Sequence, residues 1–441
     1  MGYNKFYITK TAGLGRKWTL RERFGAGGAG AGLITEERRM KKSVTGNSEL
    51  IRRINRDLVT NSIIELGCVS RTELARKVGL AMPTVMRIVE SLIEEGIVIE
   101  VGQGNSSGGR KPTLLRLNQD SMYFIGACIQ RKLKIVLSDA AGSIVCRHEV
   151  LGNYNNLSDN ILDQIVEGVE QIIERSGVPR EKIAGAGIGT PGSLFKHCDL
   201  IRDYPFVDWA QFDIDTWYSS DKLHFPVEFE NIPKLGTLGE MRFGHGRNVR
   251  NFIYVYADFG IGSGIVADGK LYMGSKGVAG EFGHTVVEAG GRACYCGNKG
   301  CLEMYSASPA IVRELREKMK AGAPTLLKLM CSPEELNFSH VLDALKKNDH
   351  LTTAAFEQAG RMLGLGLANL INLFNPEMII IGGELSDCRI YVETAKRVAA
   401  EGIFLHKAND VRIVTSALAG DDLLKGAISL AMRKVFNTVS L

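Results

Sequence analysis

Apolar residues recur with helical spacing in three successive segments between residues 48 and 96. The second segment opens on Ser70, which forms a capping-box pattern with Glu73, and it ends before Gly79. Pro83 suits the first turn of the third segment, whose apolar residues follow the spacing i, i+3, i+4, i+7 and i+8. The pattern therefore predicts one longer helix followed by a helix-turn-helix.

Two short apolar runs follow, at 97–101 and 114–117, on either side of a glycine-rich polar loop at 102–112. An antiparallel pair of strands placed after a helix-turn-helix is typical of a wing. We therefore predict a winged helix-turn-helix domain over residues 48–118.

Across residues 119–441, short apolar strands alternate with helical stretches, among them 161–175 and 353–374, which predicts an α/β body. The body contains two segments with a similar sequence pattern. Segments 124–142 and 252–269 both read as an apolar run, a loop, a second apolar run, and then an Asp followed closely by Gly. Two similar halves with a cleft between them are the simplest arrangement.

Composition agrees with a folded chain of about two to three domains, since 441 residues contain 45% hydrophobic and 23% charged residues. Residues 1–47 are the exception, because they are basic, rich in Gly and Ala and lack periodicity. We expect a disordered tail there. Translation that starts at Met40 is an alternative, and it would remove most of this tail. No apolar run approaches the ~20 residues of a membrane span, and no secretory signal pattern is present. We expect a cytoplasmic protein without membrane contact.

Charge is unevenly distributed along the chain. The net charge is +5, but residues 1–118 hold 20 Lys and Arg against 11 Asp and Glu, a net of +9, which leaves −4 for the remainder. A basic front end on a mildly acidic body indicates that nucleic acid would be bound by the front end.

A helix-turn-helix places its second helix in the major groove, where outward side chains reach base edges or phosphates. A wing loop that contains two glycines lets its backbone approach DNA closely, and the arginine of the loop can enter a narrow minor groove. The predicted DNA-binding residues are Thr84, Arg87, Ser91, Gly108, Gly109, Arg110 and Lys111. A three-helix unit that binds protein instead is the alternative.

One imidazole and three thiols fall within 18 residues, at His284, Cys294, Cys296 and Cys301. Tetrahedral Zn²⁺ accepts this ligand set, and four protein ligands leave no position open for water, so the site would be structural. One zinc ion per chain would order the glycine-rich segment 290–300. The alternative is three reduced cysteines beside an unrelated histidine.

Glycine-rich turns occur at 187–192, 260–264 and 382–383. Such turns can bring backbone N–H groups toward phosphate groups. Glycines in an α/β fold also serve purely as turns, and both interpretations stay open for each segment.

Together these segments resemble the ROK family, which contains sugar-responsive repressors and sugar kinases on a duplicated, actin-like, hexokinase-type α/β fold. The resemblance spans about residues 48–435 and is most specific at 277–284, continuing through the cysteines to Glu303. The winged helix-turn-helix and the stretch 107–112 resemble the repressor branch, because the kinases lack that domain.

By this resemblance, Asn231, Glu281, His284 and Glu303 fall where family members hydrogen-bond sugar hydroxyls. One ring nitrogen of His284 would then bind zinc, and the other would hydrogen-bond the sugar. The family's catalytic Asp is replaced here by Ile232, which cannot accept a proton. The resemblance therefore predicts a kinase-like body without a catalytic residue.

The family's phosphate-binding motif Asp-x-Gly-Gly-Thr is replaced by Cys-Ile-Gln-Arg-Lys at 128–132, which removes a carboxylate and the close backbone approach that glycine permits. We predict a transcriptional regulator, acting as a repressor of carbohydrate-related genes, that binds double-stranded operator DNA as a dimer or tetramer and senses a sugar. The alternative is a ROK sugar kinase in which Asp258 substitutes for the lost base. A scaffold controlled by protein contacts is the third hypothesis.

Overall fold

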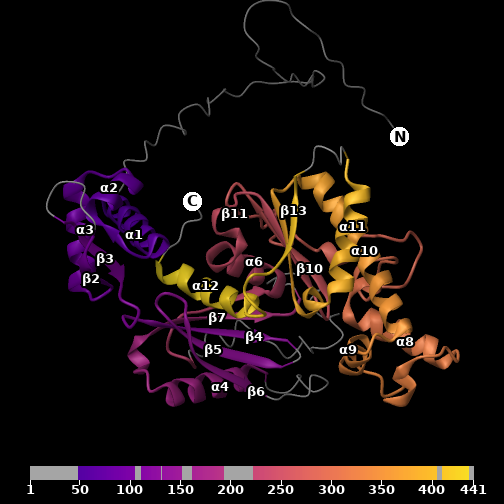
Figure 1. Cartoon of the computed structure of the whole chain (residues 1–441). Coiled ribbons are helices and arrows are strands. Elements are labelled where there is room, and N and C mark those ends of the chain that lie inside the picture. Colours follow the sequence, from indigo (N-terminus) through magenta and orange to yellow (C-terminus); the bar gives the residue numbers. More distant parts are fainter. Residues whose placement is uncertain are drawn as a thin grey trace, which may run out of the picture. The chain divides into compact units, whose positions relative to one another are not determined.

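The computed structural model describes residues 48–104, 111–130, 132–150, 161–192, 222–404 and 410–436 (Figure 1). The predicted tail at 1–47 lies outside the described residues. The same holds for three predicted wing contacts, Gly108, Gly109 and Arg110. No helix within these described ranges is both long and apolar enough to cross a membrane.

The N-terminal domain is a winged helix-turn-helix, as predicted. Its elements are α1 (Ser48–Leu66), β1 (Val69–Ser70), α2 (Arg71–Val78), α3 (Met82–Glu94), β2 (Val98–Gln103) and β3 (Thr113–Leu117). The strands form one sheet in the order β1-β3-β2 within the described residues. Ser70 caps α2 through a complete capping box with Glu73, and Gly79 ends the helix in the left-handed region at φ 67°.

The core of this domain is formed by apolar side chains from the helices and the wing. Val59 and Ile63 of α1 pack with Leu74 of α2 and with Val85 and Val89 of α3, all fully buried. The first turns of α1 are different, because apolar residues there remain exposed. The helical periodicity of α1 therefore continues beyond the part of the helix that the domain buries.

The body contains two five-stranded sheets within the described residues (Figure 1). The first consists of β4 (Tyr123–Ile129), β5 (Leu133–Asp139), β6 (Ile144–Val150), β7 (Ile183–Thr190) and β8 (Val227–Asn231), and the second of β9 (Phe252–Ala257), β10 (Ile261–Ala267), β11 (Lys270–Leu271), β12 (Met378–Gly382) and β13 (Arg412–Thr415). Their orders, β6-β5-β4-β7-β8 and β11-β10-β9-β12-β13, are identical in pattern, with an antiparallel triplet followed by two parallel strands. The predicted duplication is confirmed.

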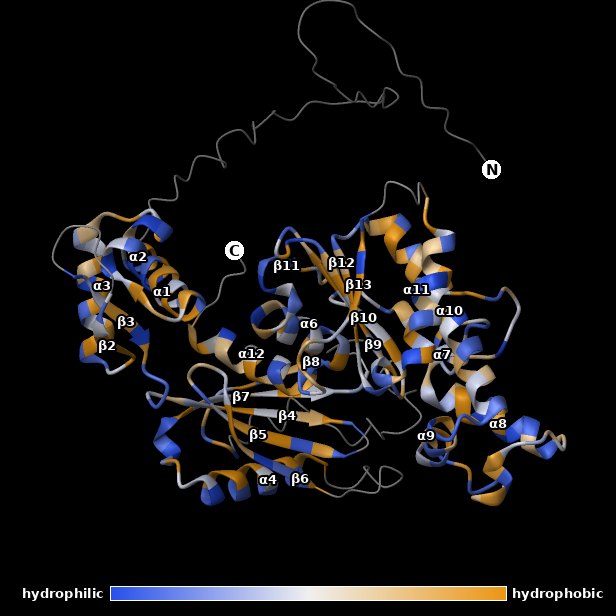
Figure 2. Ribbon diagram, viewed as in Figure 1, coloured by the Kyte–Doolittle hydropathy of each residue, from blue (hydrophilic) through white to orange (hydrophobic). Residues whose placement is uncertain are grey.

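The main helices of the body are α4 (Ile161–Ser176), α6 (Ile232–Phe243), α7 (Glu303–Ser306), α8 (Ser308–Lys320), α9 (Phe338–Lys346), α10 (His350–Phe374), α11 (Arg389–Gly402) and α12 (Asp422–Phe436). One apolar core lies between α4 and the first sheet, and another joins the second sheet to α8, α10 and α11. A third core contains α6 and α12 together with strands of both sheets. Figure 2 shows orange stretches on several of these strands, such as β4, β5 and β12.

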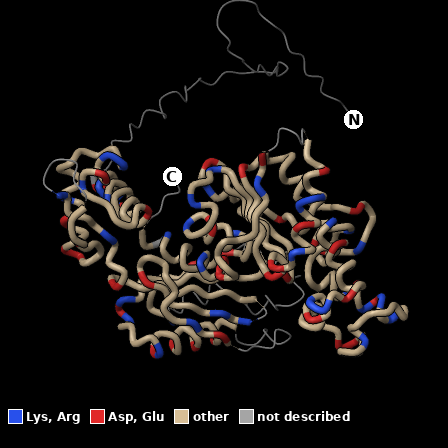
Figure 3. Tube along the Cα trace, viewed as in Figure 1, with Lys and Arg blue, Asp and Glu red and all other residues tan. Residues whose placement is uncertain are grey.

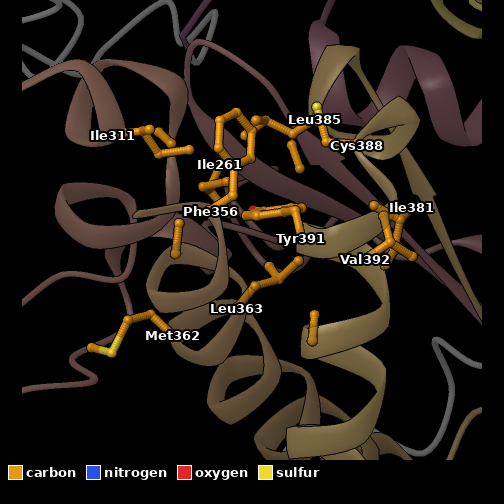
Figure 4. Close-up of a cluster of buried hydrophobic side chains, with 14 of the residues drawn as sticks. Ile261, Ile311, Phe356, Met362, Leu363, Ile381, Leu385, Cys388, Tyr391 and Val392 are labelled. Atoms are coloured by element: carbon orange, nitrogen blue, oxygen red, sulfur yellow. The ribbon is translucent and has the colours of Figure 1, made fainter. Parts of the chain in front are cut away.

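The core beside the second sheet is close-packed. Phe356 and Leu363 of α10, Tyr391 of α11 and Ile381 of β12 are fully buried and belong to one apolar cluster (Figure 4). The Tyr391 hydroxyl hydrogen-bonds with Ser306, which keeps this buried polar group satisfied. Helix α7, which closely follows Cys301, is therefore joined to α11 through this hydrogen bond.

Several glycines of the glycine-rich segments serve helix packing. A Cβ atom on Gly187 of β7 would lie 2.1 Å from the carbonyl oxygen of Ala427 in α12. One on Gly264 of β10 would lie 1.9 Å from the Thr237 hydroxyl in α6. At these positions the turn-and-packing interpretation explains the glycine without any ligand.

Candidate functional site

Helix α3, the second helix of the helix-turn-helix, presents two exposed methionines and one exposed arginine. Arg87, Met82 and Met86 all lie on the outer face of the helix, whereas Thr84 is half-buried. A guanidinium group can read guanine or contact phosphate, and methionine side chains suit thymine methyl groups. Lys111, at the described edge of the wing, is also exposed, and Figure 3 marks the Lys and Arg positions of this domain.

Ser91 has hydrogen-bond partners within the domain. Its hydroxyl donates to Glu95 at 2.8 Å and accepts from Arg56 of α1 at 3.3 Å. Arg56 also forms a bidentate ion pair with Glu95, which fixes α1 against the end of α3. The predicted DNA-contact residue Ser91 is therefore half-buried in a network that holds the helices together.

The four predicted metal ligands lie together in space. The ligand atoms of His284, Cys294, Cys296 and Cys301 are all within 4.8 Å of one another. The His284 Nδ1 atom is 3.6 Å from the Cys294 sulfur, and the sulfurs of Cys296 and Cys301 are 3.7 Å apart. Zn–S distances of about 2.3 Å and Zn–N distances of about 2.0–2.1 Å place tetrahedral ligands about 3.5–3.8 Å apart, so these residues fit zinc.

The backbone brings these ligands together through local pairing. His284 ends a short 3-10 helix over Phe282–His284. Val286 pairs with Cys301 in an isolated antiparallel bridge, and the Gly300 carbonyl accepts from Val287 at 2.9 Å. Burial raises the pKa of the Cys301 thiol to about 12. A metal would therefore have to displace a firmly held proton.

The two ring nitrogens of His284 face different groups. Nδ1 lies against Cys294, while Nε2 is 3.4 Å from the hydroxyl of Tyr295. The rings of His284 and Tyr295 meet edge to face, with centroids 5.3 Å apart. One nitrogen is thus oriented toward the metal cluster and the other away from it.

Glu303 occupies a half-buried position beside the same cluster. Its Oε2 atom accepts from the backbone N–H of Ile261 at 2.8 Å, which ties it to β10. Burial raises the pKa of Glu303, and hydrogen bonds from the Tyr295 hydroxyl and the Ile261 amide act in the opposite direction. Tyr295 therefore connects His284 with Glu303, two residues predicted to contact sugar.

Asn231 and Glu281, the other predicted sugar contacts, come from different parts of the body. Asn231 ends β8 and caps α6, where its side-chain oxygen accepts from the Lys234 N–H at 3.2 Å. Glu281 lies at the start of the short helix that contains His284, and its side chain is exposed. Gly280, just before it, has φ 94° and packs so closely on Ser263 that a Cβ atom would collide with the Ser263 carbonyl oxygen.

Ile232, which we predict from the resemblance to replace the family's catalytic Asp, is 5% exposed and packs in the core around α6 and α12. The substituted phosphate-motif segment also has partners of its own. Gln130, directly after β4, donates to the Tyr256 hydroxyl at 3.3 Å, and that hydroxyl is 3.1 Å from Asp258. A hydrogen-bond chain therefore connects the first strand hairpin of one half to the corresponding hairpin of the other.

Sequence reasoning missed Tyr295 and Lys234. Tyr295 could have been found from its position between two predicted metal ligands, which places it next to the cluster in the chain. Lys234 gave no such signal, because lysines are almost always exposed and its burial depends on tertiary contacts.

Comparisons with known proteins identify relatives of this chain. A model described as the ROK family matches residues 129–434. The xylose repressor of Caldicellulosiruptor bescii is 30% identical over 389 residues, which cover 88% of this chain and 97% of that protein. A solved ROK family transcriptional regulator, a homologue of the Escherichia coli Mlc protein, has a TM-score of 0.72 and 26% identity over 88% of this chain and 98% of its own.

A ROK family glucokinase from Streptomyces griseus, solved with glucose and AMPPNP, has a TM-score of 0.60 and 27% identity. It covers 70% of this chain and 99% of its own, less of this chain than the regulator covers. The family model matches more than half of the chain, and the chain belongs to the ROK family.

Proposed function

We propose that the protein is a sugar-responsive transcriptional repressor of carbohydrate-related genes that acts on operator DNA in the cytoplasm. The observation that carries this proposal is the combination of a winged helix-turn-helix with a ROK body in one chain. The similarity to a xylose repressor over 97% of that protein supports the same conclusion. In this proposal, residues 48–118 bind DNA and residues 119–441 bind the effector.

The test is fluorescence anisotropy of the full chain on its own upstream DNA and on a scrambled duplex across a salt series. We expect tighter binding to the upstream DNA and a decline in affinity with rising salt, because Lys and Arg contacts release counterions. Xylose and glucose are then added to the complex. Equal affinity for both duplexes at every salt concentration would contradict the proposal.

The proposed effector site comprises Asn231, Glu281, His284 and Glu303. Its support is that His284 and Glu303 are joined through Tyr295 and that Asn231 and Glu281 have amide and carboxylate groups, which suit sugar hydroxyls. Zinc would be structural and would hold the segment 290–300 with three thiolates and His284 Nδ1. Binding of sugar would favour one arrangement of the two halves and thereby change the spacing of paired DNA-binding domains.

A kinase is the second candidate, and the contacts of the body argue against it. Ile232 offers no base, and Asp258 faces the Tyr256 hydroxyl and the Glu384 backbone N–H, the latter at 3.4 Å. The Gln130–Tyr256–Asp258 chain connects the two hairpins directly. ATP-dependent consumption of xylose or glucose, abolished by Asp258→Asn, would overturn the repressor proposal in favour of the kinase.

We also propose that the protein is a homo-oligomer, at least a dimer, because one winged helix contacts too few base pairs for useful specificity. Exposed apolar side chains at the end of α10 and α11 support self-association. Leu373 is 76% exposed and Phe404 is 77% exposed, and Asn372 links the two segments by accepting from the Phe404 N–H at 2.8 Å. Sedimentation equilibrium of the full chain tests this, and a monomer at operator-binding concentrations would contradict it.

A further inference from the structure

One charged side chain in the body is buried next to the proposed effector site. Lys234 lies in the first turn of α6, and its side chain is only 2% exposed. An ammonium group is costly to bury unless acceptors and an opposite charge compensate for the lost water. Its partners therefore indicate what the lysine does.

The ammonium group of Lys234 has two partners on different segments. It donates to the Gly277 carbonyl at 2.5 Å, and it lies 3.9 Å from the Glu230 carboxylate. Glu230 also accepts from the Asn231 backbone N–H at 2.9 Å. The lysine thus joins the end of β8, in the first sheet, to the start of segment 277–281.

Segment 277–281 is held from its other side by the second sheet. Ser263 of β10 donates to the Gly280 carbonyl through its backbone N–H at 2.9 Å and through its hydroxyl at 3.0 Å. The segment carrying Glu281 is consequently held between β10 and Lys234. A cation is suited to this position, because it can bind a carbonyl oxygen and a carboxylate together.

We infer that Lys234 is a positioning residue of the effector site: it fixes the distance between Asn231 and the segment that carries Glu281, and it thereby determines which sugar fits. The inference rests on the proposed function, since it concerns the same site. Lys234 itself, with its ammonium group occupied by protein partners, acts through Asn231 and Glu281.

The test compares full-length Lys234→Met, which keeps an unbranched apolar stem and removes the ammonium group, with the wild type. Calorimetric titration with xylose and with glucose is expected to show that the preferred sugar loses about tenfold in affinity, since one charge-assisted hydrogen bond is removed. The preference between the two sugars is expected to decrease as well. Lys234→Arg should retain most of the wild-type preference, and the exposed Lys276→Met should match the wild type.

A second measurement needs no sugar. Hydrogen exchange of backbone amides at 277–284 is expected to be faster by about tenfold in Lys234→Met, because the segment loses one of its two supports. Glu230→Gln, which keeps the acceptor for Asn231, should change exchange in the same direction. If Lys234→Met does not bind operator DNA, the variant is not correctly folded, and the exchange rates of Glu230→Gln then show whether the Lys234–Glu230 pair positions segment 277–281.

Unchanged sugar affinity together with unchanged exchange would overturn the inference. If wild-type protein binds operator DNA but neither sugar, the proposed choice of effector fails, while the exchange measurement still decides whether Lys234 positions the segment.

Discussion

Cys296 contributes one of three sulfurs to a compact cluster, and its sulfur lies 3.7 Å from that of Cys301. Cys296→Ser is expected to reduce bound zinc from about one equivalent to near zero and to loosen segment 290–300, which has little apolar surface of its own. Elemental analysis of native protein and hydrogen exchange of that segment measure both effects. Cys68→Ser, an exposed cysteine outside the cluster, is the matched control and should keep the metal.

Asp422 is a buried carboxylate at the start of α12 that accepts a hydrogen bond from the Tyr254 hydroxyl. Burial raises the pKa of Asp422, so between its unfolded and folded pKa values the folded protein binds more protons than the unfolded chain. Stability from this group therefore falls as pH rises through that window. Asp422→Asn is expected to raise the free energy of unfolding at about pH 8 and to change it less at about pH 5.

Urea unfolding at the two pH values measures this effect. The neighbouring Asp421→Asn serves as control, because Asp421 forms an ion pair with Arg147 near the surface and should change stability by about 1 kcal/mol or less. A lower stability of Asp422→Asn at the higher pH would contradict the argument.

Among single residues, the sequence identified those whose spacing in the chain indicates a metal site. His284 and the three cysteines could be selected because metal ligands need close spacing in the chain, and the structure brings all four together. Lys234 and Gln130 could not be selected, since their partners are distant along the chain and nothing local marks them.

Among the elements, α3 has the clearest functional expectation. Arg87→Ala should weaken operator binding about tenfold or more and relax the choice of base at one position, because a bidentate arginine discriminates by about 1–3 kcal/mol. Anisotropy on operators with single base changes measures this. Arg389→Ala, an exposed arginine at the start of α11, should bind as the wild type does. Equal losses on all sequences would make Arg87 a phosphate contact.

Element boundaries were predictable where capping chemistry is local. Ser70, Glu73 and Gly79 delimit α2 as expected, since each acts on its own turn of helix. The start of α10 was placed at Thr353, whereas the helix begins at His350 because Asp349 caps it through the Thr352 N–H. Strand β1 was missed, because two residues show no periodicity and their pairing with β3 is a tertiary contact.

In the whole molecule, α6 and α12 occupy the core that contains strands of both sheets. Gly426→Ala in α12 would place a Cβ atom 1.9 Å from the Leu235 carbonyl oxygen of α6, so the helices must separate. We expect a loss of about 1–3 kcal/mol in unfolding free energy, measured by urea denaturation. Gly168→Ala in α4 is the matched control, because its Cβ would meet side chains and no backbone atom, the nearest being the flexible end of Ile135 at 2.4 Å and the next His148 at 3.3 Å. A smaller loss for Gly426→Ala than for this control would contradict the packing argument.

The duplication of the body was predictable from two similar hairpin patterns, and both sheets follow them. The packing of α6 and α12 with both sheets was not, because the glycines that permit it also suit ordinary turns. Gly187 and Gly264 are explained only by the fold, in which Ala427 and Thr237 lie too close to them for any side chain.

Helix α12 is the last described element of the chain, yet its residues pack against β4 and β7, which are made much earlier. During synthesis, the first sheet therefore remains without one of its covering helices until almost the whole chain has left the ribosome. Premature termination before Asp422 would leave Phe124 and Val136 without their apolar neighbours on α12. A nearly complete polypeptide ending there would be expected to aggregate or be degraded, and even a late stop codon would abolish the protein.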